Sequence, residues 1–220
     1  MKKIVFYMIL SMLCLTACGK EKPKSAETDA AQTEAVQTEN AQTEAEAPDA
    51  SGVTRDEVMA FLSSPGANGL LNGEFSDIES ACISVMDMVY QVNSSTVDSY
   101  QVMEVLEESG EEIYTDITCL TTKEVDRLTR QILGVNGDHP SISYDTDYLE
   151  SLDVWYLQHG DTNHVGFTLG EITAEKDKVT AILTDVGTYD SRDIKVTLER
   201  NEFGGLRYRA IERIGEPKLE

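Results

Sequence analysis

The chain has 220 residues, with 40 acidic against 18 basic side chains and a formal net charge of -22. Such a surface repels phosphate backbones and anionic lipid headgroups, which excludes nucleic acid as a partner and excludes attachment to a membrane surface by charge. Thirteen carboxylates lie between Asp56 and Asp116, and no Lys or Arg occurs between Arg55 and Lys123. We interpret this run as a solvated acidic face, and the alternative is a patch for divalent cations or a basic partner.

Residues 1–17 have the pattern of a lipoprotein signal peptide. Two lysines precede the apolar run 4–15, which is too short to cross roughly 30 Å of hydrocarbon as a permanent span. The run ends in Leu15-Thr16-Ala17-Cys18, which resembles the lipobox of bacterial lipoproteins. This resemblance implies cleavage after Ala17 and a diacylglyceryl group on Cys18. We therefore expect Cys18 to anchor the chain to the extracytoplasmic side of a membrane; an ordinary secretory signal or an uncleaved anchor is the alternative.

Residues 18–52 are predicted to form a disordered acidic tether behind the anchor. Large apolar side chains are nearly absent there, and Gln-Thr-Glu recurs at 32–34, 37–39 and 42–44. Such a segment cannot bury enough surface to offset the entropy cost of ordering. As a flexible coil it spans about 30–35 Å. Residues 53–220, about 168 in number, suit a single globular domain held near the membrane.

The first half of this domain carries helix-start signals. Three segments place Ser or Thr three residues before Glu, the pattern of a capping box. They are Thr54 with Glu57, Ser76 with Glu79, and Thr121 with Glu124. The first helix is predicted to end before Pro65-Gly66, and the third to end at Leu133 before Gly134.

The second predicted helix is the longest of the set. Its apolar residues recur at intervals of three and four, which favours one continuous helix to about residue 92. These residues are Ile78, Cys82, Val85, Val89 and Val92. A fourth helix is predicted over residues 97–108, before Ser109-Gly110.

After Asp138 the apolar period changes to two, which predicts strands. The alternating sets are Val165, Phe167 and Leu169; Ala181 and Leu183; and Ile194, Val196 and Leu198. The short turns between them favour antiparallel neighbours. The fold class is therefore predicted as α+β, with N-terminal helices packed on a C-terminal antiparallel β-meander sheet. A cone-shaped sheet, as in nuclear-transport-factor-like domains, is one version of this fold.

The register of the last hairpin follows from charge and burial. A two-residue turn at Gly204-Gly205 would set like charges opposite each other and mix the two faces. A five-residue loop over 201–205 avoids this. We expect it to place Leu198 opposite Tyr208, Val196 opposite Ala210 and Glu199 opposite Arg207.

Cys82 and Cys119 form an even pair in a domain that is predicted to be exported. A disulfide between them would stabilise the fold by roughly 3–4 kcal/mol in the chain-entropy model. Two separate buried thiols are the alternative, because free Cys is often buried. Spacing alone leaves both open.

The segment His159-Gly160-Asp161-Thr162-Asn163-His164 is the candidate turn or site. Gly, Asp and Asn suit a turn between a strand over 154–158 and the strand at Val165. His159, Asp161 and His164 also offer ligand types that zinc uses, and His139 is the one distant further histidine. We favour the turn, with Asp161 and Asn163 in it, and assign no metal or cofactor.

Residues around this segment carry a further resemblance. Tyr148-Leu149-Glu150, Asp153, Tyr156 and His159-Gly160-Asp161-Thr162-Asn163 resemble a signature of uncharacterised extracytoplasmic lipoprotein domains of Gram-positive anaerobes. Looser similarity at 68–71, 112–118 and 122–126 extends it over most of residues 55–214. The resemblance implies a location outside the cytoplasm and this fold class, and it brings no activity with it.

Motifs of common enzymes do not occur in the sequence. It has no Walker loop, nucleophile elbow, GxGxxG, HExxH or CxxC. Asp145-Thr146-Asp147 begins like a calcium loop, but Leu149 and Glu150 stand where a ligand and a glycine are required. We therefore expect a ligand- or protein-binding module whose partner is an envelope protein or a small molecule. The alternative is a cell-envelope hydrolase with a metal at the His159–His164 segment.

Overall fold

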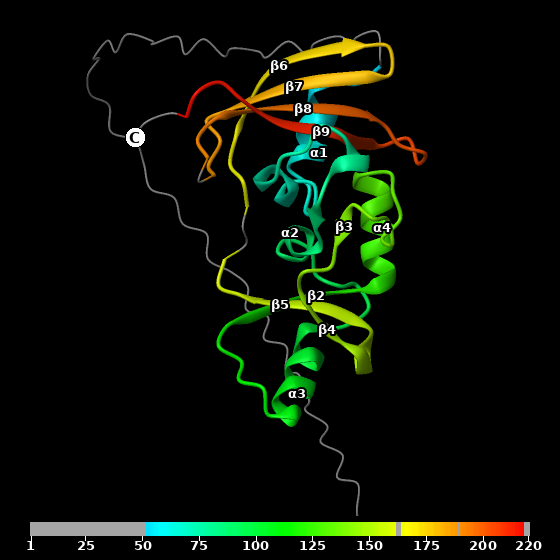
Figure 1. Cartoon of the computed structure of the whole chain (residues 1–220), viewed down its shortest axis with the longest axis vertical. Helices are drawn as coiled ribbons and strands as arrows, with labels where there is room; N and C mark the ends of the chain where they lie inside the picture. The colour runs from blue at the N-terminus through cyan, green and yellow to red at the C-terminus, as the bar shows by residue number, and fades with distance from the viewer. Residues whose placement is uncertain (1–51, 162–163, 189, 218–220) are drawn as a thin grey trace, which may run out of the picture. The chain divides into compact units, whose positions relative to one another are not determined.

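The computed structural model describes residues 52–161, 164–188 and 190–217 (Figure 1). The predicted signal peptide, Cys18 and nearly all of the tether lie outside these residues, and so do Thr162 and Asn163. No helix within the described ranges is long and apolar enough to cross a membrane.

The helices are short and most of them precede the main sheet. They are α1 (Arg55–Leu62), α2 (Val85–Val89), α3 (Ser99–Ser109) and α4 (Thr122–Ile132), with 3-10 turns η1 (Gly69–Asn72), η2 (Ile78–Ser80) and η3 (Glu150–Leu152).

The strands form three sheets in the described residues. A parallel pair joins β1 (Ile83–Ser84) to β3 (Ile142–Ser143). A three-stranded antiparallel sheet has the order β2-β5-β4, with β2 (Asp116–Thr121), β5 (Val154–His159) and β4 (Asp147–Leu149). A four-stranded meander comprises β6 (Thr168–Glu175), β7 (Lys178–Thr184), β8 (Asp193–Arg200) and β9 (Leu206–Ile214). The α+β class with antiparallel sheets is confirmed.

Helices α1, α3 and α4 begin where local capping chemistry predicts. Thr54 caps α1 by accepting a bond from the Glu57 amide at 3.2 Å, although the Glu57 carboxylate pairs with Arg200 instead of closing the box. Thr121 and Glu124 form the complete box of α4. Asp98 caps α3, and Gly110 ends it with a φ of 84°, a left-handed conformation that glycine adopts without strain.

The prediction of one long second helix is wrong. The chain instead forms η2, then strand β1, then α2, which is five residues long. Ser84 caps α2 by accepting from the Met86 amide at 3.0 Å, and Ile83 pairs with Ile142. Cys82, a member of the predicted apolar stripe, is exposed. The stripe was a coincidence of spacing, because pairing with β3 competes with helix at residues 83 and 84.

The meander and its last loop are confirmed, with one register difference. The loop spans residues 201–205, Leu198 pairs with Tyr208 and Glu199 with Arg207. Val196 faces Ile211, whereas Ala210 was predicted. A bulge at Arg209 inserts one residue and lets Ala210 and Ile211 both lie inside, 7% and 0% exposed.

The three-stranded sheet changes the predicted layering. The strand at 154–158 exists as β5, but it pairs with β2 and β4 and not with the strand that follows residue 164. Helix α3 packs on one face of this second sheet, through Val102 and Leu106 against Ile117 and Cys119. The helices therefore do not all pack on one sheet, because α3 packs on the three-stranded sheet.

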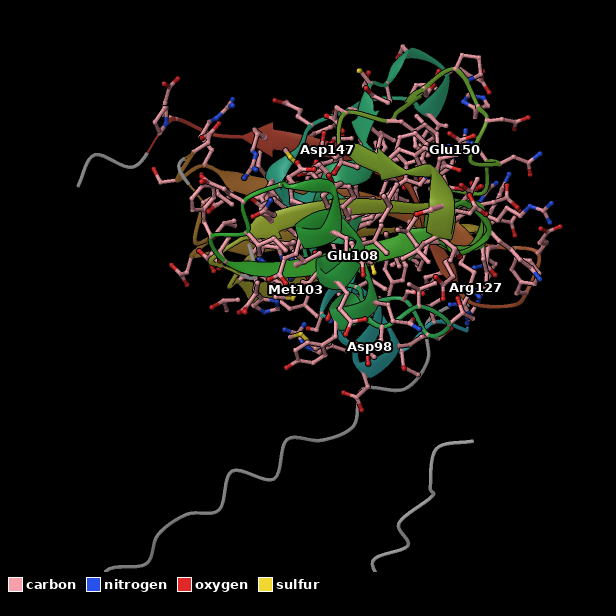
Figure 2. The ribbon with its side chains drawn as sticks, turned by 90° about the horizontal axis from the view of Figure 1, so that it is seen from below. Asp98, Met103, Glu108, Arg127, Asp147 and Glu150 are labelled. Carbon is pink, nitrogen blue, oxygen red and sulfur yellow. The ribbon has the colours of Figure 1, made fainter. Side chains whose placement is uncertain are left out.

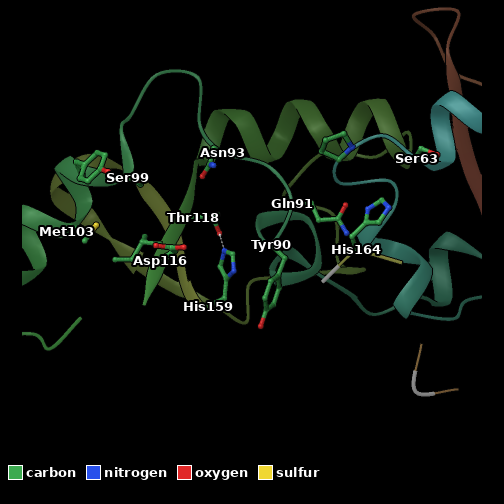
Figure 3. Close-up of a pocket in the computed structure, with 13 residues that line it drawn as sticks. Ser63, Tyr90, Gln91, Asn93, Ser99, Met103, Asp116, Thr118, His159 and His164 are labelled. Carbon is green, nitrogen blue, oxygen red and sulfur yellow. Dashed lines mark hydrogen bonds between the residues drawn. The ribbon is translucent and has the colours of Figure 1, made fainter. Parts of the chain in front are cut away.

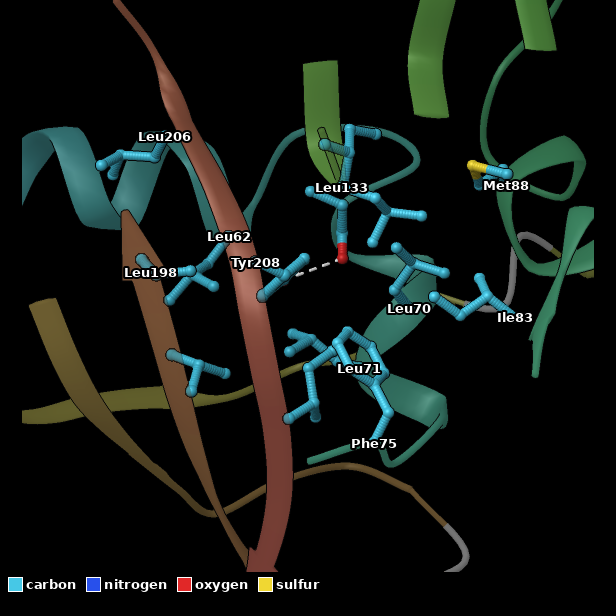
Figure 4. Close-up of a cluster of buried hydrophobic side chains, with 14 of the residues drawn as sticks. Leu62, Leu70, Leu71, Phe75, Ile83, Met88, Leu133, Leu198, Leu206 and Tyr208 are labelled. Carbon is cyan, nitrogen blue, oxygen red and sulfur yellow. Dashed lines mark hydrogen bonds between the residues drawn. The ribbon is translucent and has the colours of Figure 1, made fainter. Parts of the chain in front are cut away.

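The larger core gathers buried apolar side chains of the meander with those of residues 53–89 and of α4 (Figure 4). Tyr208 of β9 is fully buried there, its ring centroid 5.0 Å from that of Phe61. Its hydroxyl donates to the Ala67 carbonyl at 3.0 Å, so the buried polar tip is satisfied. This contact ties the loop after α1 to the sheet.

Of the two alternatives for the cysteines, the structure has separate thiols and no disulfide between them, although only one of the two is buried. Cys82 is exposed, while Cys119 is 1% exposed beside α3. Burial, together with the charge of Glu124, raises the pKa of the Cys119 thiol to about 11. Cys119 therefore stays protonated and behaves as a small core residue.

Candidate functional site

A pocket of about 610 Å³ lies beside β2. Four groups of residues line it: those after α1 and α2, those at the start of α3, those on β2 and at the end of β5, and one in the connection that follows β5 (Figure 3). They are Ser63, Pro65, Tyr90, Gln91, Asn93, Ser99, Tyr100, Met103, Asp116, Ile117, Thr118, His159 and His164. Residues more than 90 positions apart in the chain therefore share one cavity.

His159 stands at the centre of the lining. Pairing of Asp116 with His159 in the β2–β5 ladder fixes the position of His159 at the last residue of the central strand. Its Nε2 lies 2.9 Å from Thr118 Oγ1, and its ring packs on Tyr90 with centroids 4.8 Å apart. Its Nδ1 is buried with no hydrogen-bond partner among the described residues. The contacts with Thr118 and Tyr90 thus hold the His159 ring in place, while Nδ1 has no hydrogen-bond partner among the described residues.

Asn68 positions the far end of the pocket. This side chain is fully buried, and its Oδ1 accepts from the Val165 amide at 2.8 Å and from Gln91 Nε2 at 3.1 Å. Its Nδ2 donates to the carbonyls of Leu62 and Val165, at 3.2 and 3.0 Å. One amide therefore holds Gln91 and the residue after His164 in place.

The structure divides the predicted site residues. His159 and His164 line the same pocket, but Figure 3 shows them on either side of Tyr90. Asp161 is exposed and is not part of the lining, Asn163 lies outside the described residues, and His139 is 3.6 Å from Glu79 on another part of the unit. In the described ranges no three His, Cys, Asp or Glu side chains are grouped as a metal site requires.

The predicted turn also differs from the observed connection. Residues 160–167 link β5 of the three-stranded sheet to β6 of the meander, so they do not close a hairpin between paired strands. The period-two pattern at Val165 and Phe167 belongs to this connection, and β6 begins only at Thr168. The alternation found two buried positions, Val165 and Leu169, and a partly buried one, Phe167, but Val165 and Phe167 lie in the connection and only Leu169 is in the strand.

The charged side chain in the described lining is acidic. The described residues of the lining include Asp116 and two histidines, and no Lys or Arg. Tyr100, which is 71% exposed, and Met103 supply apolar surface, while Gln91 and Asn93 supply amides. Such a lining has donors and acceptors for a polar ligand but no cation for an anionic one.

Glu124 fixes the segment that forms one rim. Its carboxylate accepts from the Ser95 amide and hydroxyl, both at 2.7 Å, and from the Thr121 amide at 3.0 Å. Burial acts to raise the pKa of Glu124, but hydrogen bonds from Ser94, Thr121 and Ser95 outweigh it and lower the pKa to about 2. The carboxylate is therefore charged, and it holds Ser95 next to the pocket-lining Asn93.

Comparisons with known proteins give no indication of function, so the functional argument rests on the residues described above. No protein-family model matches the chain, and searches of curated proteins and of solved structures gave no significant match.

A second carboxylate with a shifted pKa lies outside the lining. Burial, and then the charge of Asp145, raise the pKa of Asp87 to about 6. Asp87 sits on α2, and the pocket lining includes neither it nor Asp145. Shifted carboxylates often mark active sites, but this one stands apart from the cavity.

Sequence reasoning missed most of the lining. Tyr90, Tyr100 and Thr118 carry no motif, and they come from three elements whose proximity depends on the second sheet. Asn68 gave no signal either, since buried Asn cannot be told from a loop Asn by local pattern. The one usable signal was the pair of histidines.

Proposed function

We propose that this chain is a membrane-anchored extracytoplasmic lipoprotein whose folded part binds an uncharged or cationic ligand. The observation that carries the proposal is the pocket beside β2, with aromatic and amide groups around Asp116 and no basic side chain. In this proposal the N-terminal helices pack on the meander and hold the walls of the pocket. The lipobox at Cys18 and the resemblance to extracytoplasmic lipoprotein domains support the location.

A hydrolase is the second candidate, and it rests on Thr118 and His159. Their 2.9 Å contact has the distance of a nucleophile and its base. However, Thr118 is 8% exposed within a strand, and His159 Nδ1 has no hydrogen bond to a carboxylate of the described residues that would orient the ring. A base without an orienting group is a weak catalyst. Binding is therefore the stronger proposal.

Replacing Cys18 with serine is expected to abolish anchoring, because a hydroxyl cannot take the place of the acylated thiol. The wild-type chain should enter the detergent phase in phase partitioning, held by two acyl chains that each contribute about 0.8 kcal/mol per buried CH₂. The Cys18→Ser chain should stay in the aqueous phase once its signal segment is removed. Cys82→Ser serves as the matched control, and equal partitioning of both variants would contradict the anchor.

Filling the pocket is expected to remove ligand binding without unfolding the chain. In a thermal-shift screen of defined amino acids, short peptides and oligosaccharides, a true ligand at about 100 times its Kd stabilises by about 2.7 kcal/mol and raises the Tm by several degrees. Asn93→Trp, at an exposed lining position, should abolish that shift. Glu108→Trp, exposed on α3 outside the lining, should retain it.

Two results would refute ligand binding at this pocket. One is a screen in which none of these compounds raises the Tm of the wild-type chain. The other is an Asn93→Trp chain that responds to the ligand as the wild type does, which would place the site elsewhere. Release of a hydrolysis product, lost on His159→Ala, would instead move the hydrolase to first place.

A further inference from the structure

The strands at the edges of the sheets differ in how their free backbone groups are covered. On the outer side of β6, the Arg55 guanidinium binds the carbonyls of Leu169 and Gly170. On the outer side of β9, Phe75 and Ile211 exchange two backbone bonds of 2.8 Å. These contacts cover part of each edge of the meander, which is one way in which folded proteins limit strand addition.

The N-terminal half of β2 has no such cover. Antiparallel pairing turns the amide and carbonyl of every second residue of β2 away from β5. Cys119 is one of these residues, since its carbonyl accepts from the Ser94 amide at 2.7 Å outside the sheet. Ile117, two positions earlier, turns its amide and carbonyl to the same side. No described residue forms a backbone hydrogen bond with them there.

The pocket follows this open edge. Its lining includes Ile117, whose side chain faces α3, and Thr118, whose side chain faces Tyr90 and His159. The side chains of successive strand residues point to opposite faces of the sheet, so this cavity reaches both faces of β2. Because β5 occupies one edge of β2, the cavity must pass round the other, free edge or round the end of the strand. Asn93, next to the edge-bonded Ser94, also lines it.

We propose that the open edge of β2 at Asp116–Thr118 binds an extended peptide that adds as a further strand, with apolar and basic side chains in alternation. This inference rests on the proposed function and names the ligand class of the same pocket. Strand addition draws its affinity from main-chain bonds and its specificity from alternate side chains. Asp116–Thr118 span about 10 Å, and Ile117 is the residue among them whose amide and carbonyl are open, so the edge suits a segment of a few residues.

The two faces of the edge set the alternation. On the α3 side, the added strand meets Met103 and Ile117, which are packed in the smaller core, together with the exposed ring of Tyr100. On the other side it meets Asp116, Thr118 and His159. Every second side chain of the peptide is therefore apolar, and those between are basic or polar.

Charge decides among the candidate occupants. Helix α3, which packs on the second sheet, carries exposed Glu104, Glu107 and Glu108, and no Lys or Arg occurs in the sequence between Arg55 and Lys123. Figure 2 looks at this end of the unit, with α3 in front of the second sheet. A second copy pairing through β2 would bring two such acidic surfaces together, and the acidic segment 31–45 would also be repelled. A basic partner is attracted by the same field.

The first experiment measures binding of acetyl-Lys-Leu-Lys-Leu-Lys-amide to the full chain in detergent. The expected result is saturable binding, at least tenfold tighter than that of the matched peptide with Glu in place of Lys. The Asp116→Lys chain should bind the basic peptide about tenfold more weakly. Asp147→Lys makes the same charge change on β4, at the opposite edge of the sheet, and should leave the affinity within a factor of two.

The second experiment identifies the strand pairing. Each peptide amide is methylated in turn, which removes one donor without changing the charge. The carbonyl of Ile117 is the open acceptor of Asp116–Thr118, so affinity should fall about tenfold when the one amide that donates to it is methylated and stay nearly unchanged at the other positions. A loss at every position or at none would overturn strand addition while leaving ligand binding in the pocket intact.

The remaining outcomes assign the edge to other occupants. Binding of a peptide of residues 31–45 in preference to the basic peptide would assign it to the chain's own N-terminal segment and overturn the proposal. A dimer that dissociates on Asp116→Lys, with no binding of the basic peptide, would assign it to a second copy. Failure of all peptides, beside a Tm shift with an oligosaccharide that Asn93→Trp abolishes, would refute the inference and retain the proposed function.

Discussion

Replacing Asn68 with alanine is expected to lower the free energy of unfolding by about 3–5 kcal/mol. Asn68 is 0% exposed and forms hydrogen bonds with the Val165 amide and carbonyl, the Leu62 carbonyl and the Gln91 side chain. Removing the amide leaves several buried polar groups unsatisfied, at about 1–3 kcal/mol each. Chemical denaturation of the full chain measures the loss from the shift of the midpoint at constant m-value.

Two variants make this prediction specific. Asn93→Ala, at an exposed Asn on the pocket rim, should change stability by no more than about 0.5 kcal/mol. Asn68→Asp keeps the acceptor atom but loses both amide donors and buries a charge, so it should be at least as destabilising as Asn68→Ala. A cost of less than about 1 kcal/mol for Asn68→Ala would mean that water or a shifted backbone satisfies these groups.

The Asn68 substitution should also reach the pocket. Val165 directly follows His164, and Gln91 directly follows Tyr90. Loss of the hydrogen bonds from Asn68 to Val165 and Gln91 should therefore make the pocket wall more mobile at both of these places. Under conditions where the Asn68→Ala chain is still folded, amide exchange at Val165 should become faster than in the wild type. Ligand affinity should fall with it, because the bound ligand would then have to order the wall.

Local chemistry made much of the fold predictable. Capping boxes at Thr121 and Asp98 involve residues three apart, and their geometry depends on little else. The meander was equally accessible, since its strands follow one another through short turns. The register at Leu198 and Tyr208 followed from charge and burial, and only the bulge at Arg209 escaped that reasoning. A bulge is a response to two adjacent residues, 210 and 211, that both need burial.

Nonlocal pairing explains the failures. The residues from Ile78 to Val92 have helical spacing, but a two-residue bridge from Ile83 and Ser84 to β3, roughly sixty positions away, interrupts the helix before α2. In the second sheet β2 pairs with β5, and a whole helix and a long connection separate the two strands in the sequence. No local sequence pattern predicts such a pairing. The candidate site could not be predicted in full for the same reason. His159 and His164 were visible as a pair, but Tyr90, Thr118 and Asn68 become relevant only once those strands have met.

Removing the Glu124 carboxylate is expected to cost about 3 kcal/mol in Glu124→Ala. This side chain is 8% exposed and accepts from Ser95 and Thr121, closing the capping box of α4 and holding the pocket rim. Loss of a helix cap costs about 1 kcal/mol, and hydrogen bonds to a charged group contribute about 1.5–3 kcal/mol. Glu124→Gln keeps one acceptor oxygen but turns an NH₂ donor toward the cap or the Ser95 amide, so its cost should be about half as large.

The contribution of Glu124 should depend on pH with a defined sign. Its pKa is about 2 in the folded chain, against an ordinary value of 4.5 for this carboxyl group. A group whose pKa is lower when folded stabilises the fold fully above the unfolded value, and this stabilisation is lost as the pH falls through the folded value. At 1.36 kcal/mol per pKa unit, about 2–3 kcal/mol should disappear between pH 5 and pH 2.

Denaturation of wild-type and Glu124→Gln chains across this range isolates the effect, because every other carboxylate is present in both. The difference in unfolding free energy between the two chains should be largest above pH 5 and should shrink steadily as the pH falls toward 2. Glu108→Gln removes an exposed carboxylate from α3 and supplies the control, for which the difference from wild type should stay near zero at every pH. A Glu124→Gln difference that is constant from pH 6 to pH 2.5 would mean that the carboxylate acts through shape alone. A shrinking difference would show that the charge accepting from Ser95 and Thr121 holds the rim against the start of α4.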